Sequence, residues 1–596
     1  MPTHRLRVSA ILTAIGTMAA LSAVSGWSPA ASAPAYTVQS LHFKVQVGPD
    51  KSKTCDVVGD LYKPAAASAT RRVPAILTTN GFGGSAADQT PFAQKYASLG
   101  YAVLSYSGLG FGGSGCKITL DDPDPDFDGQ AGSQLVSFLG GAGGIGFTDA
   151  AHTAAAAPVD FIERDKVDHA GKKRVDDPRV GMWGGSYGGQ VQFAVASIDA
   201  RVDALNPQIT WNDLSYSLGP NNTGQTKGVS TAVPGATKVT WAAAFSAVGI
   251  FEGVRYAQND PQRLIGCPNF ADFVCPALVT GGATGYLQPD AVAALRHASV
   301  ADYMSRIKIP LLLDQGEVDT LFNLNESVAT YKALKSQGTP VKLMWRYNGH
   351  SGGVPSAEGA AYEATRIQSW FDHYLKGTSA STGPEFAYYQ DWDGKVGTSS
   401  SSTPGKATKL YLSDKGLVDS TAKIRPGTQS FVTTAAGAPT TLGELDAVGG
   451  QVGVPLPLPD VNLPGTFASW TGEPLAKATT VVGSPELDVT VSAPTAAISQ
   501  VAGPSGQLVM FAKVYDVDAA GKASLINSLV APVRVPDVTK PIHVMLPAFA
   551  HRFAPGHRIG VYLAGGDANY RAGTVSAPVS VVTGSAAQRL TLPVVN

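Results

Sequence analysis

Four glycines surround one serine in the segment RVGMWGGSYGG, residues 179–189. Gly184, Ser186 and Gly188 fit the pattern G-x-S-x-G, in which a serine stands on a sharp turn between a strand and a helix. Glycine weakens a regular element by about 0.5–1 kcal/mol relative to alanine, so this cluster needs a reason, and a crowded turn is one. The apolar residues before Ser186 predict a strand and those after it predict a helix. Ser186 is therefore the candidate nucleophile.

A serine hydroxyl needs an imidazole to take its proton and a carboxylate to orient that imidazole. Where this motif occurs, the three residues follow the chain order serine, acid, histidine. Asp319 comes in the loop after the apolar run IPLLLDQG, and His350 lies in NGHSGG after the next run. We expect Asp319 and His350 to lie beside Ser186, at the carboxyl ends of two strands. Asp314 and Glu317 are alternative acids, but Asp314 follows its apolar run directly and fits better as a strand-capping residue.

Acyl transfer also requires N–H groups that face the negative oxygen of the tetrahedral intermediate. The backbone N–H of Tyr187, the residue after the serine, is one candidate. The second donor should come from a loop after an earlier strand, and the segment NGFGG, residues 80–84, has suitable glycines. We nominate the N–H of Phe82, with an ordinary glycine-rich turn as the alternative interpretation.

A second polar motif, DDPDPDFDG at residues 121–129, imitates the start of a calcium-binding loop through Asp124, Asp126 and Asp128. The twelfth position of such a loop needs a glutamate that binds with both oxygens, and here it is Leu135. The sequence therefore favours a solvated acidic loop, and we predict neither a metal site nor a cofactor.

The sequence around these candidate residues predicts alternating strands and helices that would position them. Short apolar runs end at Gly, Asn or Ser, as strands buried on both faces do: VPAILTTN, YAVLSYS, RVGMWGG, IPLLLDQG and VKLMWRYN. Helical stretches separate them at residues 90–100, 150–165 and 358–377, and two further strands, LHFKVQV and CDVVGDLYKP, precede them. This alternation predicts an α/β fold with a doubly wound, mostly parallel sheet.

The pattern changes along the chain and suggests several domains, as the length of 596 residues requires. We assign residues 36–210 and 301–396 to the α/β core, and 211–300, where alternation stops and aromatic residues appear in Ala-rich helical sequence, to an inserted helical cap. Residues 397–409 are polar and predict a linker. Residues 410–596 contain strands separated by Pro and Gly turns, without a convincing helix, and predict an all-β sandwich or jelly roll.

The first 35 residues have the features of a secretory signal peptide. Arg5 and Arg7 precede an apolar run of about 17 residues, and small residues follow, with cleavage candidates after Ala33 and Ala35. A membrane anchor is the alternative, but the run is short for a span. We expect a secreted protein with no membrane attachment after cleavage.

Four cysteines in an exported chain favour disulfides over metal or redox chemistry. Pairing Cys267 with Cys275 and Cys55 with Cys116 is the arrangement that we favour among three possible ones. Charged residues make up only 15% of the chain and the formal net charge is −1, so nothing points to a nucleic-acid partner. A small molecule or a neutral polymer is the expected partner, and the oligomeric state is not predicted.

With these residues in place, the chain resembles the X-Pro dipeptidyl-peptidase and cocaine-esterase (CocE/NonD) family of α/β-hydrolases. The resemblance rests on GMWGGSYGG, IPLLLDQGEVDTLF, SWFDHYLKG, EPLAKATTVVGSPELDVTVSA and FAPGHRIGVYLAG. It implies an α/β-hydrolase core, a cap and a jelly roll, a triad of Ser186, Asp319 and His350, and cleavage of esters or amides through an acyl-enzyme without a cofactor. Members often use a tyrosine hydroxyl as an oxyanion donor, whereas this chain has Phe82 in the equivalent loop TTNGFGG.

Three functions are compatible with this sequence. A secreted serine esterase or broad acyl hydrolase is the leading hypothesis, with a small ester or peptide as substrate. A prolyl exopeptidase of the same fold is the alternative, and it would need a carboxylate that holds the free amine of the substrate. A sugar-binding protein on an inactive hydrolase scaffold is a further alternative, which a complete set of serine, acid and histidine disfavours.

Overall fold

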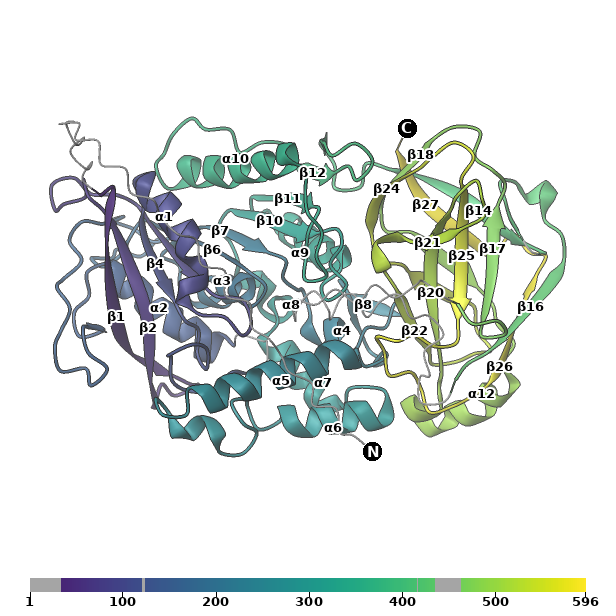
Figure 1. The fold of residues 1–596 in the computed structure, drawn as a ribbon, viewed down its shortest axis with the longest axis horizontal. Helices are drawn as coiled ribbons and strands as arrows, with labels where there is room; N and C mark the ends of the chain where they lie inside the picture. Colours follow the sequence, from purple (N-terminus) through teal and green to yellow (C-terminus); the bar gives the residue numbers. More distant parts are fainter. Residues whose placement is uncertain (1–33, 120–123, 415, 435–461, 596) are drawn as a thin grey trace, which may run out of the picture.

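The computed structural model describes residues 34–119, 124–414, 416–434 and 462–595. The predicted signal peptide lies outside these residues except for its last two positions. Figure 1 shows two parts side by side, a mixed α/β part and a C-terminal part built from strands. None of the helices within the described ranges is long and apolar enough to cross a membrane.

An 11-stranded sheet organises the α/β part. From β12 across to β4 all neighbouring strands are parallel, and antiparallel strands complete both edges. In order across the sheet the strands are β13 (Val396–Ser399), β12 (Phe386–Tyr389), β11 (Val341–Arg346), β10 (Leu311–Gly316), β7 (Val202–Gln208), β6 (Val180–Gly185), β3 (Ala75–Thr79), β4 (Ala102–Tyr106), β2 (Lys53–Pro64), β1 (Tyr36–Val47) and β5 (Gly146–Phe147). The predicted fold class is confirmed, because the five apolar runs form β3, β4, β6, β10 and β11.

Helices cover both faces of this sheet, which explains why its central strands are apolar on both sides. Tyr96 and Trp370 pack with Ile76 and Leu312 on one face. Phe193 and Leu334 pack with Leu77, Leu205 and Leu313 on the other. The helices are α1 (Thr90–Ser98) and α10 (Ala357–Tyr374) on the first face, and α2 (Gln130–Leu139), α3 (Tyr187–Ile198) and α9 (Leu324–Ser336) on the second.

One predicted helix, at residues 150–165, is wrong. This segment is irregular, and its end pairs with the chain before β3 through hydrogen bonds from the Val73 N–H to the Phe161 carbonyl (3.0 Å) and from the Glu163 N–H to the Val73 carbonyl (2.9 Å). Pro158 contributes no N–H and disfavours helix in the residue before it. Extended pairing therefore overrides the helical propensity of the alanines here.

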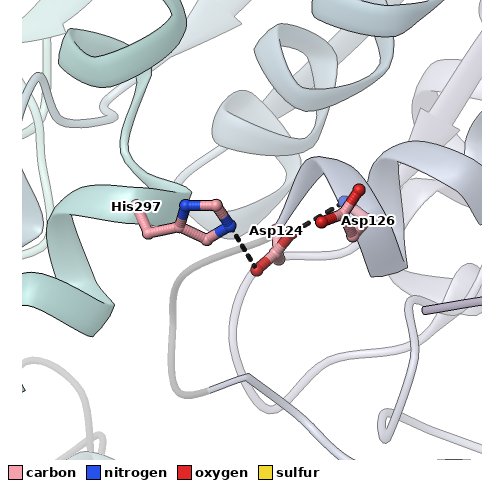
Figure 2. A group of neighbouring side chains, drawn as sticks. All are labelled: Asp124, Asp126 and His297. Atoms are coloured by element: carbon pink, nitrogen blue, oxygen red, sulfur yellow. Dashed lines mark hydrogen bonds and ion pairs between the residues drawn. The ribbon is translucent and has the colours of Figure 1, made fainter. Parts of the chain in front are cut away.

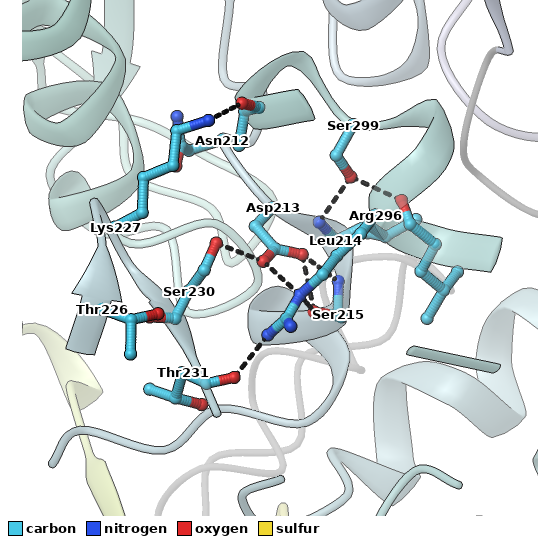
Figure 3. A network of polar contacts seen from close by, with 12 residues as sticks. Asn212, Asp213, Leu214, Ser215, Thr226, Lys227, Ser230, Thr231, Arg296 and Ser299 are labelled. Atoms are coloured by element: carbon cyan, nitrogen blue, oxygen red, sulfur yellow. Dashed lines mark hydrogen bonds and ion pairs between the residues drawn. The ribbon is translucent and has the colours of Figure 1, made fainter. Parts of the chain in front are cut away.

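An inserted segment between β7 and β10 is mostly helical, as expected for the cap. Figure 3 shows how its two ends are joined: Arg296, Ser215 and Ser230 all point at the carboxylate of Asp213. Asp213 is fully buried, and the Arg296 Nε donates to it at 3.0 Å. The elements of this segment are α4 (Leu214–Leu218), β8 (Gln225–Lys227), β9 (Ser230–Thr231), α5 (Val239–Arg255), η3 (Pro261–Leu264), α6 (Val274–Thr284), α7 (Pro289–Ala298), α8 (Val300–Tyr303) and η4 (Met304–Arg306).

Both disulfides have the pairing that the sequence analysis favours. Cys267 and Cys275 form a short loop inside the inserted segment, and Cys55 on β2 is bonded to Cys116 after β4. The described residues contain no free cysteine.

The C-terminal part is a curled all-β sheet of 12 strands around buried apolar residues such as Trp470. The expected linker is shorter than residues 397–409, because β13 and β14 leave only residues 400–405 between the two sheets, and a short helix, α12 (Pro494–Ser499), was not predicted. The strands are β14 (Lys406–Ser413), β15 (Gly416–Val418), β17 (Phe467–Gly472), β18 (Thr479–Gly483), β19 (Glu486–Val489), β20 (Leu508–Val517), β21 (Ala523–Leu525), β22 (Ala531–Val535), β23 (Ile542–Met545), β24 (Phe549–Phe553), β25 (Arg558–Ala564) and β27 (Arg589–Val595), with a separate pair, β16 (Gly427–Val432) and β26 (Pro578–Thr583).

A partly buried histidine on β24 joins the two parts. The His551 Nδ1 lies 2.9 Å from an oxygen of Asp391, which follows β12, and its Nε2 lies 3.0 Å from an oxygen of Asp516 on β20. Burial by itself would lower the pKa of His551, but the hydrogen bonds to the two carboxylates outweigh it and raise the pKa to about 9. The imidazolium, which hydrogen-bonds to a carboxylate at each ring nitrogen, therefore stabilises the contact between the two parts at neutral pH.

This contact predicts a loss of stability at alkaline pH. Since the folded pKa of His551 lies above the unfolded value of about 6.5, its contribution is complete below pH 6.5 and is lost as the pH rises through about 9. We expect the Tm from circular dichroism to fall more steeply between pH 7 and pH 10 in wild type than in His551→Gln. His543→Gln is the matched control, because His543 bonds Asp488 but its side chain is 51% exposed. Equal slopes in wild type and His551→Gln would contradict the prediction.

Candidate active site

Ser186 stands at the junction of β6 and α3, on the predicted sharp turn. Its backbone has φ 56° and ψ −123°, a strained conformation for a residue with a side chain. The glycines around it are sterically required: a Cβ on Gly188 would lie 2.6 Å from the Thr79 carbonyl oxygen, and one on Gly184 would lie 2.8 Å from the Gly188 carbonyl oxygen. The turn therefore holds the serine side chain outward while backbone passes closely on both sides.

The structure brings all three predicted residues into one hydrogen-bonded chain. The His350 Nε2 lies 2.8 Å from the Ser186 Oγ, and its Nδ1 lies 2.7 Å from the Asp319 Oδ2. The other oxygen of Asp319 accepts from the N–H groups of Leu321 (3.0 Å) and Phe322 (2.8 Å). Asp319 is fully buried and Ser186 is 7% exposed. A carboxylate held in this way can orient the imidazole and stabilise its positive charge.

The loops that carry the acid and the histidine follow β10 and β11, which are parallel neighbours in the sheet. They pack so closely that a Cβ on Gly349 would lie 2.6 Å from the Asp319 Cβ. The Thr320 N–H also donates to the Ser351 Oγ at 3.0 Å. The two loops therefore hold the imidazole and the carboxylate at a fixed separation.

The two alternative acids have other partners. Asp314 lies within β10, with one carboxylate oxygen 3.4 Å from the Arg346 guanidinium, and Glu317 accepts the Tyr389 N–H at 3.0 Å. Burial raises the pKa of both carboxyl groups. Of the three acids considered from the sequence, the structure places only Asp319 against His350.

The glycine-rich loop 80–84 lies beside the serine, because the Cβ position of Gly81 is 3.8 Å from the Ser186 Cβ. Within the described residues the Phe82 N–H has no hydrogen-bond acceptor, so it is available to a substrate. The Phe82 ring packs on Phe111 and on Phe245 of α5, with centroid distances of 5.2 and 4.8 Å. The inserted segment therefore contacts the nucleophile region through aromatic side chains.

Two aromatic residues that the sequence analysis did not assign to the site contact the imidazole. The rings of Phe322 and Trp241 stand edge-on to His350, with centroid distances of 5.0 and 6.2 Å. Trp241 comes from α5, and its position in an aromatic-rich insertion was the only sequence signal. These contacts restrict the orientation of the imidazole and make its surroundings apolar.

Residues 121–123 of the acidic motif lie outside the described residues, and the rest of it, residues 124–129, differs from the expected solvated loop, so that prediction is wrong there. Asp124 and Asp128 are buried, with 7% and 4% exposure. Asp128 accepts a hydrogen bond from the hydroxyl of Tyr187, the residue after the serine, and burial raises the pKa of Asp128 to about 7. Asp128 was not predicted as part of the site, and its contact anchors the side chain of Tyr187.

Figure 2 shows Asp124 and Asp126 of this motif next to His297 of α7. Ligand-type atoms of Asp124, Asp126 and His297 lie within 4.8 Å of one another. The Asp124 Oδ1 accepts from the Asp126 N–H at 2.7 Å, and the Asp124 Oδ2 lies 3.6 Å from the His297 Nε2. These contacts join α7 to the segment before α2.

A serine on a strand–turn–helix elbow, with its acid and histidine on the following loops of a parallel sheet, defines a serine hydrolase of the α/β-hydrolase fold. Residues 54–352 match the X-Pro dipeptidyl-peptidase (S15 family), and residues 381–574 match the X-Pro dipeptidyl-peptidase C-terminal non-catalytic domain. The chain belongs to this family, which includes the CocE/NonD hydrolases.

Several solved structures share the fold over nearly the whole chain. An aminopeptidase from a marine sediment archaeon, Thaumarchaeota archaeon, aligns with a TM-score of 0.64 at 13% identity, covering 96% of this chain and 98% of its own. An α-amino acid ester hydrolase aligns with a TM-score of 0.62 at 14% identity, covering 96% of this chain and 98% of its own. A CocE/NonD family hydrolase from Staphylococcus aureus aligns with 0.60 at 14% identity, covering 93% of each chain. No curated protein sequence gives a significant match.

Proposed function

We propose that this protein is a secreted carboxylic ester hydrolase that works through an acyl-enzyme. The observation that carries the proposal is the continuous chain of hydrogen bonds from the Ser186 Oγ through His350 to the buried Asp319. Ser186 is the nucleophile, His350 is the general base, and Asp319 orients the imidazole and stabilises the imidazolium.

The reaction follows from this geometry in two halves. The Ser186 Oγ attacks the carbonyl carbon of the substrate while the His350 Nε2 takes its proton, and the tetrahedral oxyanion accepts from the N–H groups of Tyr187 and Phe82. When the intermediate collapses, the imidazolium gives its proton to the leaving alcohol and the acyl group stays on Ser186. A water molecule, deprotonated by the same imidazole, then releases the acid and restores the serine.

The surroundings of the serine favour an ester over a peptide with a free amino terminus. Aromatic rings stand close to the serine: Phe245 packs on Phe82 of the loop 80–84, and Trp241 packs on the imidazole. Two carboxylates lie next to this region and both have protein partners: Asp88 accepts the Ser85 N–H at 2.8 Å, and Glu252 lies 3.7 Å from the Arg255 guanidinium. Each carboxylate is therefore already engaged with a protein group.

An X-Pro dipeptidyl-peptidase activity is the second candidate, and the match of residues 54–352 to that family supports it. The proposal of secretion rests on the features of residues 1–35 and on the two disulfides, which persist in an oxidising compartment.

The two candidates are separated by their substrates. We expect kcat/KM for p-nitrophenyl acetate and butyrate to exceed that for an X-Pro p-nitroanilide by at least about 100-fold, because one unpaired substrate ammonium in an apolar site costs about that factor. A fluorophosphonate should label Ser186 in the same preparation. Faster cleavage of the anilide would instead establish the exopeptidase, and absence of both labelling and ester cleavage would overturn the assignment as an active hydrolase.

A further inference from the structure

A buried lysine contacts the turn that carries the catalytic acid. Lys238 immediately precedes α5 and is 2% exposed. Its Nζ donates to the carbonyl oxygens of Thr320 (2.8 Å) and Leu321 (3.0 Å), the two residues after Asp319. Burial of an ammonium costs free energy unless specific acceptors hold it, and these two carbonyls are among the groups that hold this one.

The lysine completes the set of hydrogen bonds that hold this turn. The N–H groups of Leu321 and Phe322 donate inward to the Asp319 carboxylate, while the carbonyls of Thr320 and Leu321 accept from Lys238. The peptides next to Asp319 are therefore held on both their N–H and their C=O sides. Their orientation decides where the second carboxylate oxygen meets the His350 Nδ1.

The C-terminal sheet in turn holds the segment that carries the lysine. The Arg571 N–H donates to the Thr237 carbonyl at 2.8 Å, Asn569 contacts the Thr240 hydroxyl, and the Lys238 Nζ lies 5.9 Å from the centre of the Tyr570 ring. All three contacts come from the loop after β25, which we call the 567–572 loop.

A buried ion pair fixes that loop. The Lys513 Nζ of β20 lies 2.7 Å from the Asp567 carboxylate, with both side chains fully buried, and Asp567 also accepts the Asn569 N–H at 3.0 Å. The C-terminal sheet thus holds the backbone on both sides of Lys238, and the Lys238 ammonium in turn contacts the turn of Asp319.

We propose that Lys238 is a positioning residue for Asp319 and that the 567–572 loop of the C-terminal part keeps Lys238 in place. This inference rests on the proposed triad. It gives the C-terminal part a role in catalysis, although none of its side chains needs to touch the substrate. The all-β sheet positions Asp319 indirectly, by holding the lysine whose ammonium group contacts the turn of Asp319.

The test compares Lys238→Met with Lys238→Arg and with a matched control. Lys238→Met removes the donor, and we expect kcat for p-nitrophenyl acetate to fall by about 10- to 100-fold with KM changed less than about twofold, because misplacement of a catalytic group by about 1 Å costs up to that factor. Lys238→Arg keeps a cationic donor and should recover kcat to within about threefold of wild type. Lys227→Met is the control, because Lys227 also donates to a carbonyl in the inserted segment, that of Ala301. Its kcat should not change.

A second pair of variants tests the link to the C-terminal part without removing the lysine. Asn569→Ala should lower kcat by about threefold, and in the Lys238→Met background it should add nothing, because both changes act through the same group. Wild-type kcat in Lys238→Met, a loss that Lys238→Arg does not recover, or multiplicative losses in the double variant would each overturn the inference. If Lys238→Met does not fold, a wild-type kcat in Asn569→Ala would overturn the inference.

The outcome is distinguishable from a failure of the proposed function. If the Ser186→Ala enzyme is active, the assignment of the triad is wrong, and the inference about Lys238 is lost with it. An inactive Ser186→Ala enzyme together with a fully active Lys238→Met enzyme would remove only the role of the lysine.

Discussion

Replacement of Ser186 by alanine is expected to lower kcat for p-nitrophenyl esters by at least about 10⁴-fold while leaving the Tm within about 2 °C of wild type. Without the Oγ no acyl-enzyme can form, and the remaining rate comes only from the oxyanion donors and substrate binding. The fold should tolerate the change because alanine adds no bulk and has the same backbone cost as serine at φ 56°.

Ser197→Ala is the matched control for this variant. Ser197 lies on the same helix, and its hydroxyl bonds the Ala194 carbonyl at 2.8 Å, away from the imidazole. Its kcat should equal that of wild type. More than about 1% of the wild-type rate in purified Ser186→Ala would show that another group is the nucleophile.

Replacement of His350 by glutamine should cost about as much, on the order of 10⁵-fold in kcat, because an amide cannot accept the serine proton. Since the triad acts as a unit, the double variant with Ser186→Ala should be no slower than either single variant. Steady-state hydrolysis of a p-nitrophenyl ester measures kcat of the single and double variants, and circular dichroism checks that each of them is folded. A double variant that is slower by the product of the two losses would contradict a shared mechanism.

The acid is assigned by comparing two conservative substitutions within the same segment. Asp319→Asn should lower kcat by about 10⁴-fold, because an amide in place of the carboxylate favours the wrong tautomer of the imidazole. Asp314→Asn should leave kcat within about threefold, since Asp314 faces Arg346 and not His350. The reverse ranking of these two variants would move the role of the acid to Asp314.

The nucleophile could be identified from the sequence because its requirements are local. The glycine at 184 is needed because a Cβ there would meet the Gly188 carbonyl of the same turn, and a strand before the turn and a helix after it complete the pattern. His350 and Asp319 followed from a rule of chain order and from their place after apolar runs. Strands buried on both faces have nearly uniform composition, so these runs were visible without knowledge of their neighbours.

Prediction from the sequence failed or was incomplete where contacts with residues distant in the chain decide the local structure. The alanines of residues 150–165 predict a helix, but hydrogen bonds to Val73 hold the end of this segment extended. The acids of residues 121–129 predict a solvated loop, but Asp128 is buried against the hydroxyl of Tyr187. Local propensity is worth only tenths of a kcal/mol per residue, and each such tertiary contact outweighs it.

The sequence by itself determined the sheet, the elbow and the set of residues that could form the triad, because each depends on patterns a few residues long. The sequence favoured Asp319 among three neighbouring acids, and the tertiary structure settled the choice. Asp314 faces Arg346, Glu317 accepts the Tyr389 N–H, and only Asp319 of the three meets the imidazole. The tertiary structure alone decided that Lys238 lies behind that acid and that Tyr570 lies beside Lys238. Partners separated by tens or hundreds of residues leave no pattern in a single sequence, because their contact depends on how whole elements pack.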